Sequence, residues 1–260
     1  MKPIIKWSGG KSKEIKFFNS YYPENFKRFI EPFVGGGAVF FDLNFDGENV
    51  INDIHPNLIN FYKQIKLGNS EEIYNLMSEY DNDEKTYYFI RDKFIPSNEI
   101  EQAFRFFYLR KTCFRGMLRY NKSGKFNIPF GRYKTFNYEI LKEKEYENLL
   151  KKTDIMFGDV LKVFEKYNNE ENFMFLDPPY DSVFTDYGYC KYEKRNHEEL
   201  AKAFKETKNK CLMIIGETPF INDLYRDYIK TKFHKKYAFK IYNGRVGDEI
   251  DNYHLIITNY

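Results

Sequence analysis

One stretch constrains the fold of this chain more than any other: the apolar run from Phe173 to Leu176, which ends directly in Asp177-Pro178-Pro179-Tyr180. Four apolar residues in a row are typical of a strand that is buried on both faces of a parallel sheet. The prolines cannot extend a central strand, because each lacks a backbone N–H and has a fixed φ. The pattern therefore predicts an open α/β sheet with Tyr180 at the carboxyl end of a strand, where such sheets bind ligands.

The same four residues indicate a binding site for a planar ring that carries an amino group. The Asp177 carboxylate and the Pro178 carbonyl can each accept one amino hydrogen, which aims the nitrogen lone pair, while Tyr180 stacks on the ring. We therefore take Asp177, Pro178 and Tyr180 as candidate catalytic residues. The alternative is a strand followed by an ordinary proline-containing loop.

A glycine-rich turn nearer the N-terminus predicts a nucleotide-like ligand. Residues 28–33 read as a strand and residues 38–43 as a helix, with Val34-Gly35-Gly36-Gly37 between them, which is the binding geometry of Rossmann-like folds. The next strand ends in Asp53, 18 residues after Gly35, near the spacing at which an acidic side chain binds a ribose hydroxyl pair. The glycines depart from G-x-G-x-x-G, so we expect an adenosyl ligand without a specific indication of a dinucleotide.

The N-terminal sequence Lys6-Trp7-Ser8-Gly9-Gly10-Lys11 offers a ring and a cation. It is not a Walker P-loop, because that motif requires glycine where this chain has Ile5. The paired glycines let the backbone approach a ligand closely, and Trp7 and Lys11 can then contact it. On its own, a plain N-terminal turn explains this stretch better.

A series of helices without intervening strands interrupts the β–α alternation. The pattern predicts helices at residues 56–67, 70–80 and 84–95, and a further helix that Ser97 caps and that runs to about Lys111. We therefore expect an inserted helical subdomain at residues 57–136, and a main α/β unit formed by residues 1–56 and 137–260.

The chain after the insert returns to strands and helices. We expect helices at residues 137–152 and 219–228, and strands at residues 154–157, before Gly158-Asp159, and 211–215. Asn196 and Glu199 fit a capping box for a helix that ends at Thr207. Residues 231–242 and 253–258 read as an antiparallel pair, which completes a mixed seven-stranded sheet. The tyrosine-rich residues 181–194 read as a polar loop, either a lid over the site or a surface loop.

Positive charge is concentrated in one segment. Residues 105–134 contain nine of the 41 Lys and Arg residues and no Asp or Glu, whereas the rest of the chain has 32 basic and 38 acidic residues. A basic segment on an acidic body is typical of nucleic-acid binding. Within it, arginines can pair with guanine, and Phe114, Met117 or Tyr120 can wedge against opened bases. The alternative is a solvated basic loop.

Composition excludes other classes of protein. The chain has 260 residues, 42% of them hydrophobic, which suffices for one large core, and no apolar run is long enough to span a membrane. Its start lacks the apolar region of a signal peptide. Cys113, Cys190 and Cys211 are odd in number and far apart, as expected for reduced thiols. The histidines show no metal spacing, so we expect a cytoplasmic protein without a metal or a membrane partner.

Together these motifs resemble the Dam-type, D12-class DNA adenine-N6 methyltransferases over nearly the whole chain. The family has the same order of glycine motif, recognition insert and Asp-Pro-Pro-Tyr. The matching stretches are residues 6–11, 31–37, Asp53, 119–121, 127–133, 177–180, and Phe184-Thr185 with Tyr187. The resemblance implies a Rossmann-like core that uses S-adenosylmethionine, with a helical insert that recognises double-stranded DNA.

The motifs and the resemblance together assign roles to individual residues. The residues expected to bind S-adenosylmethionine are Trp7, Lys11, Phe33, Gly35, Gly37, Asp53, Asp159 and Asp177. The residues expected to contact DNA are Lys6, Phe114, Arg115, Met117, Arg119, Asn121 and Pro129. The target adenine would be flipped out of the duplex, stack on Tyr180 and donate its amino hydrogens to Asp177 and Pro178.

The chain departs from the family pattern at Arg110 and Arg115, where the family commonly has asparagine. Both positions belong to the recognition segment, so the target stays open between GATC, typical of the family, and a related short palindrome. A cognate restriction endonuclease is the expected protein partner. Three alternatives are kept: cytosine-N4 methylation, methylation of protein or RNA, and a DNA-binding protein without catalysis. The first more commonly has Ser in place of Asp177, the second does not explain the basic insert, and the third does not explain the intact motifs.

Overall fold

The computed structural model describes residues 1–121, 123–181, 192–236 and 251–260. Several positions discussed above lie outside the described residues: Lys122, Phe184, Thr185, Tyr187, Cys190, most of the loop at 181–194, and the end of the expected strand at 237–242.

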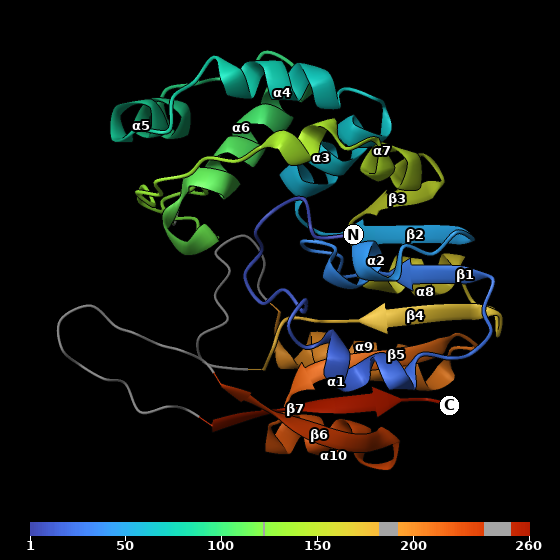
Figure 1. The fold of residues 1–260 in the computed structure, drawn as a ribbon. Coiled ribbons are helices and arrows are strands. Elements are labelled where there is room, and N and C mark those ends of the chain that lie inside the picture. The colour runs from blue at the N-terminus through green and yellow to red at the C-terminus, as the bar shows by residue number, and fades with distance from the viewer. Residues whose placement is uncertain (122, 182–191, 237–250) are drawn as a thin grey trace.

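A seven-stranded mixed sheet forms the centre of the molecule. Its strands are β1 Arg28–Glu31, β2 Glu48–Asp53, β3 Thr153–Phe157, β4 Asn172–Leu176, β5 Lys210–Gly216, β6 Ile229–Lys236 and β7 Asp251–Thr258. They lie in the order β3-β2-β1-β4-β5-β7-β6 (Figure 1). Strands β1 to β5 are parallel, and β7 runs antiparallel to both β5 and β6. The expected seven-stranded, Rossmann-like α/β core is confirmed.

Helices cover both faces of this sheet. The α-helices are α1 Ile15–Phe18, α2 Ala38–Leu43, α3 Pro56–Lys66, α4 Ser70–Ser78, α5 Glu84–Asp92, α6 Glu99–Thr112, α7 Lys144–Lys151, α8 Val160–Lys166, α9 Lys194–Glu206 and α10 Pro219–Tyr225. The 3-10 helices are η1 Asn19–Tyr21, η2 Phe114–Gly116, η3 Glu139–Lys142 and η4 Arg226–Tyr228. Helices α1 and α8 were not expected from the sequence, and the helix expected at residues 137–152 is divided into η3 and α7.

Strand β4 shows why a continuous apolar run was needed. All five of its residues are buried. Phe173 and Phe175 belong to the core on the face that α1, α2 and α3 cover, whereas Met174 and Leu176 belong to the core beneath α8, α9 and α10. Alternate side chains thus enter two different cores, so a polar residue on either face would lose its contact with water.

Two of the expected helix starts are wrong. The N-cap of α6 is Asn98, whose side chain accepts a hydrogen bond of 2.9 Å from Glu101 N, while Ser97 donates its own N–H to the Glu101 carboxylate. Both Ser97 and Asn98 can cap a helix, so composition alone could not separate them. Helix α9 starts earlier than expected, because Glu193 is the N-cap and Asn196 is the third residue, whose side chain accepts from Glu193 N at 2.9 Å.

Helices α3 to α6 follow one another without a strand and lie beyond the β3 edge of the sheet (Figure 1). Phe61 on α3 and Phe107 on α6 stack with their ring centroids 5.2 Å apart. Both rings belong to the same hydrophobic core as Phe29 and Ile51 of the sheet. The helical region is therefore continuous with the sheet through buried side chains.

Candidate active site

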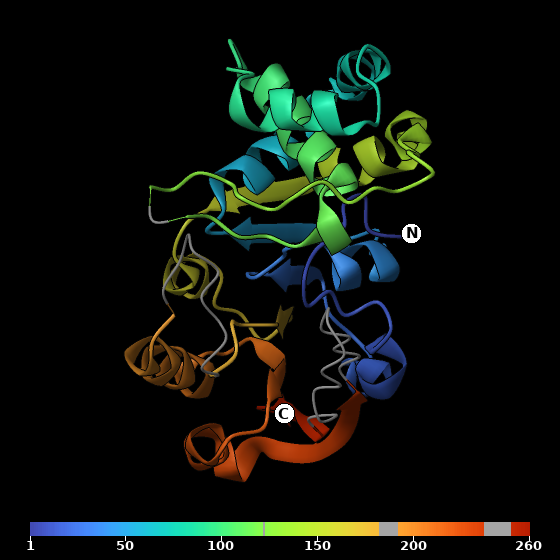
Figure 2. The ribbon, with the colours of Figure 1, turned by 90° about the vertical axis from the view of Figure 1, so that its left-hand side faces the viewer.

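The order of the sheet places the candidate site between β1 and β4. The chain winds away from β1 toward β2 and β3, and then returns to β4 and β5 on the other side. Ligands of open α/β sheets bind where the order reverses in this way, outside the carboxyl ends of the strands. Figure 2 looks onto this carboxyl edge, across which the segment before α7 runs. The apolar run before Asp177 therefore places the carboxylate at the switch point.

An ion pair joins the N-terminal motif to the motif after β4. Lys11 Nζ lies 2.6 Å from Asp177 Oδ2, and the side chains are 3% and 20% exposed. Lys11 also donates to the Gly9 carbonyl at 2.9 Å, and its Nζ lies 5.2 Å from the centroid of the Tyr180 ring. Burial raises the pKa of Asp177, and the nearby Lys11 only partly offsets this shift. The fold thus brings Lys11, Asp177 and Tyr180 together at one site.

Residues that the sequence did not indicate hold the Tyr180 ring. The imidazole of His254 on β7 meets it edge-on, with centroids 5.1 Å apart and planes at 81°. His254 Nδ1 lies 2.7 Å from Glu14 Oε2, and Lys235 pairs with the same carboxylate. Burial, followed by the charges of Lys11 and Lys235, lowers the pKa of His254 to about 3, so a neutral ring donates its Nδ1–H to Glu14.

The candidate ribose ligand, Asp53, anchors the glycine turn. Its Oδ2 accepts from Gly35 N and its Oδ1 from His55 N, both at 2.9 Å. Burial raises the pKa of Asp53 to about 6, although these N–H groups act in the opposite direction. Gly35 has φ +46°, and a Cβ there would lie 2.6 Å from Trp7 Nε1. Glycine is therefore required for the backbone conformation and for the close approach of Trp7.

Two exposed apolar side chains lie beside Asp53. Ile54 follows β2 and is 47% exposed, and Phe157 at the end of β3 is 55% exposed. Asp53 and Phe157 are register partners in the parallel pair, so both side chains belong to the carboxyl edge. Sequence reasoning missed them, because an apolar residue at a strand end looks like part of the core. Their exposure appears only in the fold.

The other candidate donor-binding residues have structural roles of their own. Gly37, at φ +69°, precedes α2, and a Cβ there would lie 2.7 Å from the Phe41 ring. Asp159 is exposed and caps α8, with Oδ1 accepting from Leu161 N at 2.9 Å. Phe33 is half-buried just after β1. All three lie in segments that follow carboxyl ends of parallel strands, the edge to which Asp53 also belongs.

Residues 113–133, here called the recognition loop, form a hairpin-like excursion. Antiparallel bridges join Cys113 to Phe130 and Tyr120 to Phe126. The residues expected to contact DNA are Lys6, Phe114, Arg115, Met117, Arg119, Asn121 and Pro129. Phe114 is half-buried, and the other six are exposed. Arg119 Nε donates to Asn127 Oδ1 at 2.8 Å, across the hairpin. The loop thus presents exposed basic and apolar side chains. Tyr120, in contrast, is half-buried, and its hydroxyl lies within hydrogen-bonding distance of His55.

Arg110 does not share the exposure of the loop. It is 1% exposed, and its guanidinium donates to the carbonyls of Lys6, Gly116 and Met117. The guanidinium also lies 5.2 Å from the centroid of the Trp7 ring. Arg110, which departs from the family pattern, therefore joins the N-terminal motif to the recognition loop through buried hydrogen bonds. Arg115, the other residue that departs from the family pattern, is by contrast exposed.

The described residues offer few features of other kinds of site. Within the part of the chain that the structure describes, no group of three or more His, Cys, Asp or Glu side chains could hold a metal ion. The same residues include no helix long and apolar enough to cross a membrane. A surface hollow lined by Lys27 and Glu171 lies away from the carboxyl edge, and these two residues pair at 2.6 Å.

Comparison with known proteins shows the family to which the chain belongs. The model of the D12 class of N6 adenine-specific DNA methyltransferases matches residues 7–241. The chain therefore belongs to this family, and it is an adenine-specific DNA methyltransferase by class.

Individual relatives match along the whole chain or most of it. The Type II methyltransferase M.CviBI of Paramecium bursaria Chlorella virus NC1A is 55% identical over all of both chains. The Type II methyltransferase M.MjaIII of Methanocaldococcus jannaschii is 32% identical over 100% of this chain and 99% of its own. A DNA adenine methylase of Haemophilus influenzae is 31% identical over 86% of this chain and 82% of its own.

Proposed function

We propose that this enzyme transfers a methyl group from S-adenosylmethionine to N6 of an adenine flipped out of duplex DNA. The observation that carries the proposal is the constellation at the switch point, where Lys11, Asp177 and Tyr180 meet. Tyr180 offers a ring face for stacking, and Asp177 offers a partly buried carboxylate at the end of β4. A base inside a duplex cannot reach such a site, so the target must leave the stack.

The residues around Asp53 fit the methyl donor. A buried carboxylate whose pKa is raised to about 6 gains when hydroxyl groups donate hydrogen bonds to its ionised form. We assign these hydroxyls to the ribose of the donor. The exposed side chains of Ile54 and Phe157 suit the faces of its purine ring. Trp7, Phe33, Gly35, Gly37 and Asp159 stay candidates for further donor contacts.

When bound, the donor supplies a methyl group on a positively charged sulfur. The Asp177 carboxylate and the Pro178 carbonyl accept the two amino hydrogens of adenine, which orients the nitrogen lone pair. Lys11 holds the Asp177 carboxylate in place through their ion pair of 2.6 Å. Tyr180 fixes the plane of the base, and Glu14 and His254 fix Tyr180. The methylated amine is cationic and acidic, so it loses its proton without a strong base.

The recognition loop is our candidate for the DNA-reading surface, together with Lys6. Its exposed arginines can contact guanine edges or phosphates, and Phe114 or Met117 can fill the gap that the flipped base leaves. We propose a target of GATC or a related short palindrome, and an action inside the cell, where the DNA lies. The names of the Type II relatives support a cognate restriction endonuclease as the partner of this enzyme.

Mapping of modified bases tests this function. The purified enzyme is incubated with S-adenosylmethionine and random-sequence duplex DNA, and the product is sequenced by a method that distinguishes methylated bases. We expect N6-methyladenine within one short palindrome, and none with Asp177→Ala. N4-methylcytosine, or no modification by a folded enzyme that binds donor and DNA, would contradict the proposal.

A further inference from the structure

His55 connects the candidate donor site to the recognition loop. It lies two residues after Asp53, and its backbone N–H donates to Asp53 Oδ1 at 2.9 Å. Its Nε2 lies 2.7 Å from the hydroxyl of Tyr120, 65 residues further along the chain. His55 thus contacts the Asp53 carboxylate through its backbone N–H and the recognition loop through its imidazole ring.

The hydrogen bonds determine the state of the imidazole. Nδ1 accepts from Leu58 N at 3.2 Å, which caps α3. Burial, followed by the charge of Arg110, lowers the pKa of His55 to about 3, so the ring is neutral. A neutral imidazole whose Nδ1 accepts carries its proton on Nε2. His55 therefore donates to the Tyr120 hydroxyl.

The surroundings leave this ring little freedom. It is 1% exposed, it meets Trp7 edge-on with centroids 5.8 Å apart, and it lies 5.4 Å from the Phe106 ring. On the other side of the hydrogen bond, Tyr120 stands between Arg119 and Asn121, which are exposed. The hydrogen bond between His55 and Tyr120 thus joins the Asp53 segment directly to this stretch of the loop.

We propose that His55 is a positioning residue that couples the binding of the methyl donor to the binding of DNA through its hydrogen bond to Tyr120. The inference rests on the proposed assignment of Asp53 to the donor. A donor that fixes the Asp53 carboxylate also fixes the His55 backbone, and the loop then loses less freedom when DNA binds. By linkage, bound DNA strengthens donor binding by the same factor.

The experiment measures the affinity for a duplex that contains the methylation site, with and without saturating S-adenosylhomocysteine. Coupling between sites is typically about fivefold or more, so we expect the product to raise the affinity of the wild type for DNA at least fivefold. Tyr120→Phe removes only the hydroxyl, and His55→Asn keeps a side chain that can cap α3. Because one hydrogen bond is lost, each variant should lower the affinity ratio at least about twofold, toward a ratio of one. The double variant should lower it no further.

Tyr87→Phe is the matched control. Tyr87 Oη donates to the Ile128 carbonyl at 2.7 Å, so this variant also removes one hydrogen bond to the recognition loop, but one that comes from helix α5 and not from the segment after Asp53. Both tyrosine variants should lower the melting temperature, but only Tyr120→Phe should change the affinity ratio. An unchanged ratio in Tyr120→Phe and His55→Asn, or a ratio of one in a wild type that binds S-adenosylhomocysteine, would overturn the inference alone. A wild type that binds no S-adenosylhomocysteine would overturn the donor assignment as well.

Discussion

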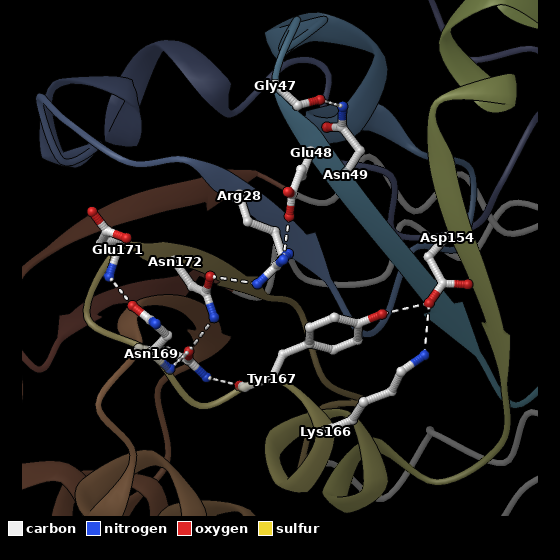
Figure 3. Close-up of polar contacts among 11 residues, drawn as sticks. Arg28, Gly47, Glu48, Asn49, Asp154, Lys166, Tyr167, Asn169, Glu171 and Asn172 are labelled. Carbon is white, nitrogen blue, oxygen red and sulfur yellow. Dashed lines mark hydrogen bonds and ion pairs between the residues drawn. The ribbon is translucent and has the colours of Figure 1, made fainter.

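Charged side chains at the amino edge of the sheet are largely exposed, whereas those at the carboxyl edge are largely buried. At the amino edge, Arg28 pairs with Glu48 and donates to Asn172, while Asp154 accepts from Lys166 and Tyr167 (Figure 3). Three of these side chains are open to water, with Glu48, Asp154 and Lys166 67%, 47% and 52% exposed, whereas Asn172 is buried. At the carboxyl edge, Lys11 and Asp177 pair at 3% and 20% exposure.

The carboxylates of the two edges respond to this difference. Hydrogen bonds from Lys166 and Tyr167 lower the pKa of Asp154, whereas burial raises the pKa of Asp177 and of Asp53. An exposed pair contributes little to stability. A buried charge is costly unless partners surround it, and a ligand can be one of these partners. The carboxyl edge therefore keeps its charged side chains at a free-energy cost that ligand binding can offset.

The largest effect should come from Asp177. Asp177→Ala removes the acceptor of an adenine amino hydrogen, and loss of one such transition-state contact typically lowers kcat by about 10²–10³-fold. Asp154→Ala, at the amino edge, should leave kcat within about twofold, because an exposed ion pair is worth at most about 1 kcal/mol. Single-turnover methylation rates of both folded variants decide the matter. Similar losses in the two variants would remove the distinction between the edges.

Asp53 should give the next largest effect, and one that depends on pH. Loss of a hydrogen bond to a charged group costs about 1.5–3 kcal/mol, so Asp53→Asn should weaken S-adenosylhomocysteine binding by that amount at pH 7. Ribose hydroxyls favour the ionised carboxylate, whose pKa is raised to about 6. Calorimetry from pH 5 to 7.5 should therefore show wild-type affinity rising with pH, and no such rise for Asp53→Asn.

The same pKa carries a consequence for stability that serves as a control. The pKa of Asp53 is raised from 3.8 to about 6 in the folded chain, so the folded state holds this proton more tightly than the unfolded state. The contribution of Asp53 to the free energy of unfolding is therefore present below pH 4 and is lost as the pH rises through 6. Donor affinity and stability should change in opposite directions with pH. Affinity that is independent of pH would contradict the role of Asp53.

Tyr180 tests whether the carboxyl edge stacks a base. Stacking of a base on an aromatic side chain contributes about 1–3 kcal/mol, so Tyr180→Ala should raise KM for DNA or lower kcat by a corresponding factor. Tyr180→Phe keeps the ring and the edge-on contact with His254, and should retain most activity. Steady-state kinetics on a target duplex separate the two variants. Equal loss in both would assign the function to the hydroxyl.

The smallest effects should come from the recognition loop, where the charges are exposed. Arg119→Ala should relax the choice of base at one position of the site, because a bidentate guanine contact discriminates by about 1–3 kcal/mol. Arg115→Ala should either change sequence preference or lower the salt slope by about one unit, depending on whether Arg115 contacts a base or a phosphate. Methylation mapping at two salt concentrations is the measurement. If neither variant changes the sequence preference or the salt dependence of methylation, the recognition loop does not determine the target sequence.

Local patterns in the sequence predicted the elements that carry the main motifs. The buried strand before Asp177, the glycine turn before α2 and the strand that ends in Asp53 were all found, because apolar runs and glycines determine backbone geometry directly. These are features in which neighbouring residues constrain one another. The ion pair of Lys11 with Asp177 was not predicted, because it forms only when two motifs that are distant in the sequence meet at one edge of the sheet.

The sequence did not predict contacts between segments that are far apart along the chain. Glu14 meets His254 across 240 positions, and Arg110 reaches the Lys6 carbonyl across 104. Neither Glu14 nor Arg110 stands in a periodic or capping pattern, so nothing local marks it as buried. The caps at Ser97 and Asn196 were misplaced for other reasons. Ser97 and Asn98 are adjacent and can both cap a helix. Asn196 does belong to a capping box, but as the third residue of a helix whose N-cap is Glu193.

A crystal structure of the enzyme with S-adenosylhomocysteine tests the central claim most directly. If the carboxyl edge is the donor site, the ribose hydroxyl oxygens will lie within hydrogen-bonding distance of the Asp53 carboxylate, and the purine will lie beside Ile54 and Phe157. Density for the ligand at the amino edge, in the hollow lined by Lys27 and Glu171, with the Asp53 carboxylate untouched, would contradict the account.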